Sequence, residues 1–179
     1  TIMFNWDLVA FLPLVGIEVS VMSLVGRYMG AQTPEIAKKA AFSGMKLGSI
    51  YSSVVFLAFM ILPGALVAMF APDANDPIYA AASPLATHMI RIAGIYVIAN
   101  VFVLIFIGTL RGAGDTMFPM IISIATNWIA LAITFSFLRI LGLHPLMAWF
   151  GFAAVFLLST LAYLWRFKQG KWQKLRIIE

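Results

Sequence analysis

Long apolar runs, separated by short polar or glycine-rich segments, dominate the pattern along the chain. A hydrocarbon core about 30 Å thick is spanned by roughly 20 helical residues. Runs such as residues 101–107 lack the strict alternation of a transmembrane barrel strand. The pattern therefore predicts an all-α polytopic membrane protein with five membrane-spanning helices, at about residues 8–26, 47–70, 85–110, 117–141 and 146–165.

The segments between the first spans contain helix stop and start signals. Gly30 can end one helix, and Thr33 followed by Pro34 can begin the next. Residues 34–46 are amphipathic, with Glu35 and two lysines on one side, so we expect a short helix that rests on the cytoplasmic membrane surface before the second span.

The composition fits a membrane protein and excludes several other classes. Hydrophobic residues make up 63% of the 179 residues, whereas soluble domains are about 45–50% apolar. Cysteine is absent, which excludes disulfide scaffolds and thiolate metal sites. No positively charged stretch precedes the first apolar segment, so this segment is not expected to be a signal peptide. The first residue is Thr1, and we interpret the sequence as a piece of a longer protein.

The basic residues predict an orientation. The net charge is +5, and ten of the twelve lysines and arginines fall in loops on one side of the predicted spans. By the positive-inside rule this side, with the carboxy terminus, faces the cytoplasm. We expect the membrane to be a cell membrane of the bacterial inner type. The basic tail at 166–179, with Trp165 and Trp172, is expected to anchor on an anionic lipid surface and not to bind nucleic acid.

Glu18 lies near the middle of the first span, where a charge costs on the order of 2.5 to 3.5 kcal/mol. It shares a helix face with Phe11, Leu14 and Met22, and we expect this face to border a cavity that attracts a cation, a proton or a positively charged hydrophobic molecule. The alternative is a neutral Glu18 that only contributes to packing. The opposite face is rich in small residues and is expected to contact a neighbouring helix; it contains Gly16, Ser20, Ser23, Gly26 and Gly30.

Other polar residues in the spans are weaker candidates. Asp7 lies near the outer boundary, where simple hydration accounts for it. Tyr96 and Asn100 share one face of the third span, because they are four residues apart. Ser123, Asn127 and Thr134 lie on roughly one face of the fourth span, and hydrogen bonds between helices account for them. Single histidines and the lack of a nucleotide-binding loop give no indication of an enzyme.

Two motifs resemble the multidrug and toxic compound extrusion (MATE) family. Residues 13–31 contain Gly26-Arg27-Tyr28-Met29-Gly30, and residues 108–116 contain Arg111-Gly112-Ala113-Gly114-Asp115, followed by Pro119. The resemblance covers nearly the whole chain. It implies five helices from the carboxy-terminal bundle of a twelve-helix fold whose amino-terminal lobe is missing here.

The resemblance also implies a function. MATE transporters export hydrophobic, often cationic compounds in exchange for Na⁺ or H⁺, by alternating access between two lobes. Several members have an acidic residue eleven positions before the motif arginine, where this chain has Asn100. An amide can coordinate Na⁺ but cannot exchange a proton, so we expect Glu18 to compensate, with a Na⁺ site near Glu18 or Asn100. The motif residues are expected to shape helix packing and the cytoplasmic turn: Gly26, Gly30, Arg111, Gly112, Gly114, Asp115 and Pro119.

Two alternatives remain open at this stage. A lipid-linked saccharide flippase of the same superfamily would need several basic residues in its cavity, and only Arg91 and Arg139 approach such a depth. A non-transporting membrane scaffold would leave Glu18 without a function. If the transport hypothesis is correct, Glu18→Gln in the complete protein lowers drug export or changes its pH dependence, and no cofactor besides the coupling ion is needed.

Overall fold

The computed structural model describes residues 2–70 and 77–174, with side chains described for 4–70 and 79–173. The described residues form the helices α1 (Ile2–Gly30), α2 (Pro34–Ile61), α3 (Pro63–Ala68), α4 (Pro77–Gly112), α5 (Met117–Phe135) and α6 (Pro145–Lys168). A π-helical turn (η1, Ser136–Ile140) extends α5, and a 3₁₀ turn (η2, Lys171–Lys174) follows α6. Five segments are long and apolar enough to cross a membrane, which confirms the predicted number of spans in the described ranges.

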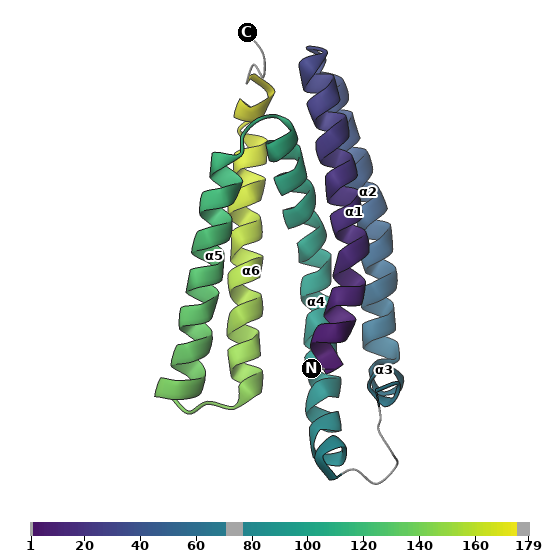
Figure 1. The fold of residues 1–179 in the computed structure, drawn as a ribbon, viewed down its shortest axis with the longest axis vertical. Helices are drawn as coiled ribbons and strands as arrows, with labels where there is room; N and C mark the ends of the chain where they lie inside the picture. The colour runs from purple at the N-terminus through teal and green to yellow at the C-terminus, as the bar shows by residue number, and fades with distance from the viewer. Residues whose placement is uncertain (1, 71–76, 175–179) are drawn as a thin grey trace.

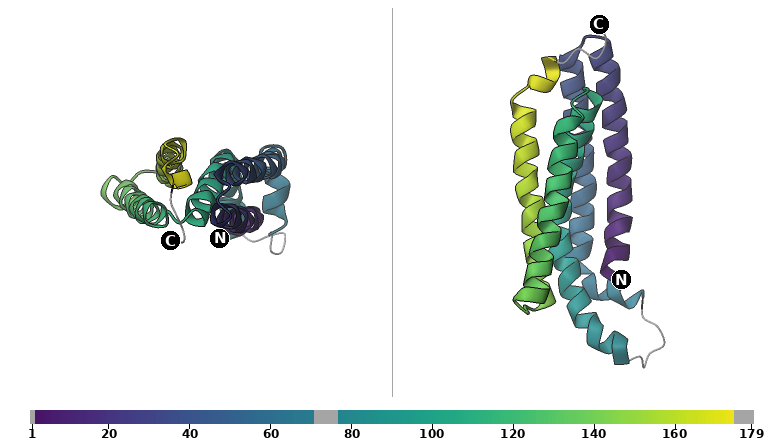
Figure 2. Two further views of the ribbon diagram at one scale, coloured as in Figure 1. Left: turned by 90° about the horizontal axis from the view of Figure 1, so that it is seen from above. Right: turned by 60° about the vertical axis from the view of Figure 1, so that its left-hand side comes forward.

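The helices form two groups on either side of α4 (Figures 1 and 2). α1, α2 and α3 lie on one side, and α5 and α6 lie on the other. α4 contacts α1, α2, α3 and α6, whereas α5 contacts mainly α6. The chain runs up and down, so that the carboxy-terminal ends of α1, α4 and α6 lie at one end of the bundle, which we call the basic end. The turn between η1 and α6 lies at the opposite end.

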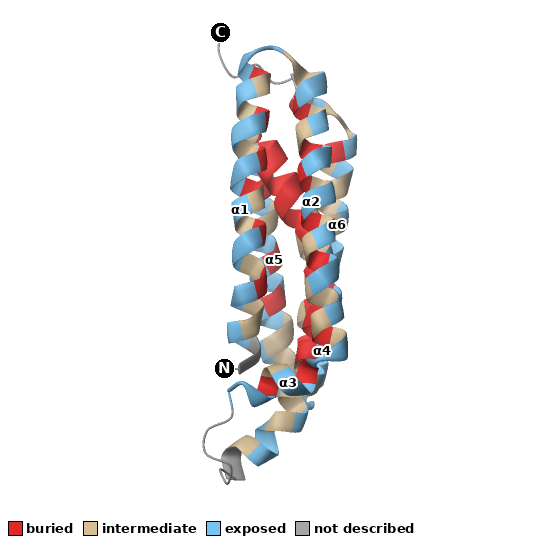
Figure 3. Cartoon of the chain, turned by 90° about the vertical axis from the view of Figure 1, so that its right-hand side faces the viewer, coloured by how far each residue is buried: buried red, intermediate tan, exposed pale blue. Residues whose placement is uncertain are grey.

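Buried residues lie mainly where the helices face one another, and the outward faces of the helices are largely exposed (Figure 3). The buried hydrophobic residues form two clusters along α4. One is near the basic end and includes Val25, Leu110 and Tyr163. The other is near the opposite end and includes Ile90, Tyr96 and Trp149. Many apolar side chains remain exposed on the outer faces, where they suit contact with lipid. The helix backbone can also lie in lipid, because its hydrogen bonds are made within the helix.

The expected separate helix at residues 34–46 is not present, because these residues form the first part of α2. Their small residues are the reason. Ala37, Ala41, Gly44 and Gly48 recur at a helical spacing and are all buried. A Cβ atom at Gly44 would lie 2.2 Å from a methyl group of Val21 on α1, so this face of α2 packs in the bundle.

The second span also differs from the predicted range of 47–70. α2 ends at Ile61, because Pro63 lacks the N–H that would continue the helix. The short helix α3 then folds against α4 and buries Val67. The Trp6 indole of α1 donates a hydrogen bond of 2.9 Å to the Leu66 carbonyl oxygen, which ties α3 to α1.

Trp172 requires a third correction. As part of a lipid-binding tail it would be exposed, but only 1% of its surface is accessible. Its ring stacks on Phe167 at 5.4 Å between centroids, and its N–H donates to the Phe167 carbonyl oxygen. Trp165, in contrast, is 60% exposed. The segment after α6 therefore turns back onto the bundle, at least as far as Trp172.

Candidate functional site

Glu18 lies at the interface between α1 and α4. One Arg111 guanidinium nitrogen donates to a Glu18 carboxylate oxygen at 3.3 Å. The Glu18 residue is buried, whereas 43% of the Arg111 side chain is exposed. The pair therefore joins a carboxylate inside the bundle to a cation at its surface, and the negative charge of Glu18 is already compensated.

Over most of α1, the two helix faces have the opposite roles to those predicted: the Glu18 face contacts a helix and the small-residue face is open. The Glu18 face packs closely on α4, where a Cβ atom at Gly108 would lie 2.7 Å from the Glu18 carbonyl oxygen. A Cβ atom at Gly112 would lie 2.4 Å from the Met22 carbonyl oxygen. The prediction failed because the residues that permit close approach are glycines of α4, so α1 can present its bulkier side.

The small-residue face of α1 is correspondingly open. A Cβ atom at Gly16 or Gly30 would meet no other atom within 4 Å. Gly16 and Ser20 instead border a groove of about 510 Å³ between α1 and α2. Only Gly26 keeps part of the predicted role, because a Cβ atom there would lie 3.3 Å from the Gly112 carbonyl oxygen.

The motif at 111–119 builds the turn between α4 and α5. Gly114 has a φ of 88°, a conformation that glycine adopts without strain. Asp115 accepts a hydrogen bond of 2.8 Å from Arg166 Nε on α6, and Arg166 also lies 5.2 Å above the Phe118 ring. The Tyr163 hydroxyl donates to the Pro119 carbonyl oxygen at 3.3 Å. These contacts join α4, α5 and α6 at the basic end.

Asp7 and Tyr96 meet near the opposite end. The Tyr96 hydroxyl of α4 donates a hydrogen bond to the Asp7 carboxylate of α1. Tyr96 is buried and Asp7 is half-buried. Asn100 follows one helical turn along α4 and is also half-buried. The structure thus brings Asp7 and Tyr96 together, although the sequence placed them on different helices without a link.

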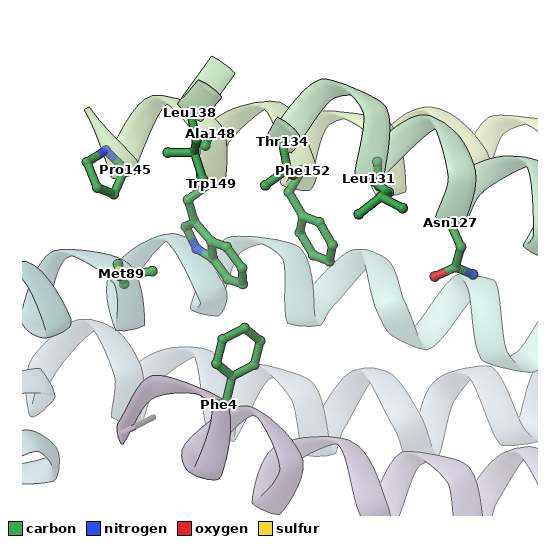
Figure 4. Close-up of a pocket in the computed structure, with 11 residues that line it drawn as sticks. Phe4, Met89, Asn127, Leu131, Thr134, Leu138, Pro145, Ala148, Trp149 and Phe152 are labelled. Carbon is green, nitrogen blue, oxygen red and sulfur yellow. The ribbon is translucent and has the colours of Figure 1, made fainter. Parts of the chain in front are cut away.

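A cavity of about 430 Å³ opens beside this pair, between α5 and α6 on one side and α1 and α4 on the other (Figure 4). Most of its wall is apolar, and α6 contributes two stacked rings, Trp149 and Phe152. Trp149 also contacts Tyr96 edge to face at 6.2 Å, which connects the cavity to the Asp7 pair. The lining residues are Phe4, Met89, Asn127, Ala130, Leu131, Thr134, Leu138, Pro145, Ala148, Trp149 and Phe152.

The sequence did not reveal this cavity. Asn127 and Thr134 were expected only to join helices, yet both line it. Ser123 does join helices, because its hydroxyl lies 2.9 Å from the Tyr163 hydroxyl. The signal for the cavity in the sequence was the mixture of aromatic and small residues at 145–153. The same mixture is common in helices that only pack against one another, so it does not identify a cavity. Among the described residues, no three His, Cys, Asp or Glu side chains group as a metal site would require.

The chain is similar to known proteins in both sequence and structure. A protein described as "Probable multidrug resistance protein NorM" from Thermotoga maritima is 29% identical over 175 residues, which cover 97% of this chain and 36% of the relative. A protein of the same description from Burkholderia pseudomallei is 30% identical over 167 residues, which cover 93% of this chain and 36% of the relative. The chain thus spans about a third of the length of these relatives.

A solved structure has the same fold. It is described as the inward-facing conformation of a multidrug resistance MATE family transporter of the MOP superfamily. It superimposes with a TM-score of 0.82 over 96% of this chain and 39% of that chain, at 14% identity. The MatE family model matches residues 1–138. The chain, with its multi-pass helical architecture, therefore belongs to the MatE family.

Proposed function

We propose that this chain forms most of the carboxy-terminal lobe of an antiporter that exports hydrophobic, often cationic compounds. The observation that carries the proposal is its membership of the MatE family, together with relatives described as multidrug resistance proteins. The apolar cavity supports it, because drug-sized ligands occupy pockets of about 300–1,000 Å³ with mostly apolar walls. Transport and not catalysis is the proposed activity, and the amino-terminal lobe is its proposed partner.

Neither of the other candidate functions has comparable support. The residues that a flippase would use for a lipid phosphate, Arg91 and Arg139, are both exposed and do not line the described cavity. A scaffold would not require a cavity between the helices.

We propose Asp7, with Tyr96 and Asn100, as the coupling-ion site of the lobe. Glu18 is the weaker candidate, because a Na⁺ ion there would have to displace the Arg111 guanidinium. The partner of Asp7 is a neutral hydroxyl, which leaves its negative charge available to Na⁺ or H⁺. Asn100 offers an amide oxygen one helical turn from Tyr96, and oxygen ligands suit a hard cation.

The test uses the complete transporter in membrane vesicles loaded with a hydrophobic cationic dye. We expect Asp7→Asn to reduce gradient-driven dye transport at least tenfold, because the neutral amide cannot exchange a proton and binds Na⁺ weakly. Imposing a Na⁺ gradient or a pH gradient separately identifies the ion. Glu35→Gln, at an exposed carboxylate of α2, is the matched control. Asp7→Asn with normal transport under both gradients would refute the coupling site.

We also propose that the basic end faces the cytoplasm. Basic residues from α1, α4 and α6 gather there, including Arg27, Arg111 and Lys168. This chain contributes no cysteine, so Gln169→Cys and Arg139→Cys, each placed in a complete transporter whose remaining cysteines have been replaced, give single reporters at the two ends. In intact cells an impermeant maleimide should label Arg139→Cys and should not label Gln169→Cys; the reverse result would invert the orientation.

A further inference from the structure

The groove of about 510 Å³ between α1 and α2 is polar at one end and apolar at the other. Lys39 and Tyr28 line the part that is close to the turn at 31–33, where the two helices meet at the basic end. Pro13 and Leu47 line the part that is farthest from this turn. Among the described side chains of the wall, Lys39 is the one that carries a charge. The groove therefore has the polarity of an amphiphile, with its charge at the basic end.

The length of the groove matches one leaflet of a membrane. Pro13 and Tyr28 are fifteen residues apart on α1, which corresponds to about 22 Å along the helix axis. One leaflet consists of about 15 Å of hydrocarbon and a headgroup layer of about 5–7 Å. With Lys39 and Tyr28 at the level of the headgroups, the apolar part of the groove extends to about the middle of the bilayer.

The wall of the groove is open to a molecule from the membrane. Gly16, Ser20 and Leu47 are exposed, and a Cβ atom at Gly16 would meet no other atom within 4 Å. The Ser20 hydroxyl donates a hydrogen bond of 2.8 Å to the Gly16 carbonyl oxygen of its own helix. An acyl chain can therefore cover this hydroxyl without removing its hydrogen bond, so covering it carries little desolvation cost.

Lys39 gives the groove a preference for a negatively charged headgroup. It is exposed, and no ion pair holds it among the described residues. Glu35, one turn earlier on α2, does not line the groove. Arg27 and Lys38 add positive charge at the same end of α1 and α2. One lysine near the membrane surface favours an anionic lipid over a neutral one by about fivefold.

We propose that the α1–α2 groove binds an anionic phospholipid of the leaflet at the basic end, with an acyl chain along the apolar wall and the headgroup phosphate at Lys39. The Tyr28 hydroxyl donates a hydrogen bond to the same headgroup. The described lining residues all belong to α1 and α2, so the site is separate from the cavity beside α5 and α6. The inference requires only that the chain spans a membrane and does not depend on the proposed export function.

The experiment uses phospholipids that carry a photoreactive diazirine in the middle of one acyl chain. The complete transporter is reconstituted in phosphatidylcholine vesicles that contain a trace of photoreactive phosphatidylglycerol or of photoreactive phosphatidylcholine. After illumination, mass spectrometry identifies the labelled peptides. We expect labelling of residues 13–24 and 36–47 to be about fivefold stronger with phosphatidylglycerol, and unlabelled phosphatidylglycerol should suppress it.

Two variants separate the headgroup contact from the acyl-chain contact. Lys39→Gln removes the charge and should reduce the preference for phosphatidylglycerol to about 1. Gly16→Leu places a side chain in the groove and should weaken labelling by both lipids, because the space beyond Gly16 is open in the structure. Lys168→Gln is the matched control, because Lys168 is exposed at the basic end but does not line the groove. It should leave the preference unchanged.

Equal labelling by the two lipids, a preference that Lys39→Gln leaves unchanged, or labelling that Gly16→Leu does not weaken would overturn the proposal. The lack of labelling at residues 13–24 and 36–47 would also overturn it, and would indicate that another segment of the complete transporter fills the groove. Dye export is measured separately. A normal preference for phosphatidylglycerol without dye export would refute the export function and leave the lipid site intact.

Discussion

The two ends of the bundle are built differently. At the basic end, α1 and α4 are in close contact through glycines, and two ion pairs surround the turn at 112–117. At the opposite end, a neutral hydroxyl meets the Asp7 carboxylate, and aromatic side chains surround a cavity. Close backbone contact and paired charges have few alternative arrangements, whereas a cavity lined by rotatable side chains can adapt. We infer that the basic end holds the helices together and that the opposite end accepts ligands.

The largest expected effect is at the Asp115–Arg166 pair of the basic end. Arg166→Met should lower stability by about 3 kcal/mol, because it leaves the buried Asp115 carboxylate without its partner. Arg111→Met should cost less, about 1 to 2 kcal/mol: it also leaves a buried carboxylate, Glu18, without its partner, but Arg111 is more exposed than Arg166 and its contact is longer. Apparent melting temperatures of the complete transporter in detergent measure both. Equal decreases in melting temperature for the two variants would show that the greater burial of Arg166 does not affect stability.

The next effect concerns helix contact. Gly112→Ala should cost about 2 kcal/mol, because the added Cβ atom would lie 2.4 Å from the Met22 carbonyl oxygen and α1 and α4 must separate. Gly16→Ala, on the open face of α1, should be neutral or stabilise by about 0.5–1 kcal/mol. The same thermal assay applies. A strong destabilisation by Gly16→Ala would mean that another part of the complete protein covers the α1–α2 groove.

The smallest effect is expected at the opposite end. Tyr96→Phe removes the donor to Asp7 and should cost about 1 kcal/mol. In a double-mutant cycle Tyr96→Phe and Asp7→Ala should be non-additive, because each removes the same hydrogen bond, one at the donor and one at the acceptor. The Tyr163 hydroxyl bonds to Ser123 and Pro119 and not to Asp7, so Tyr163→Phe should be additive with Asp7→Ala. Additivity at Tyr96 would show that the Asp7–Tyr96 contact contributes nothing.

Hydropathy alone was sufficient to predict the number and type of the spans. A run of about 20 apolar residues has few structural alternatives in lipid. The limits of α2 were harder to predict, because Lys38 and Lys39 suggested a membrane-surface helix while the buried small residues beside them gave no hydropathy signal. Pro63, inside a continuous apolar run, was a local signal for a helix end that the run obscured.

The site was less predictable than the fold, because it depends on which helix faces meet. Glu18, Asp7 and Tyr96 stood out individually as polar residues in apolar spans. Their partners are set by glycines in a different helix, since Gly108 and Gly112 decide which face of α1 approaches α4. The α1–α2 groove has no sequence signature, because its two walls come together only when the helices pair.

The burial of Trp172 has a consequence for biosynthesis. Ala37, Ala41 and Phe106 belong to the same cluster as Phe167 and Trp172, although they are added to the growing chain more than 60 residues earlier. During translation their shared surface therefore stays uncovered until α6 has entered the membrane and η2 has folded back. A chain whose synthesis stops before residue 167 is therefore expected to leave this surface of Ala37, Ala41 and Phe106 uncovered.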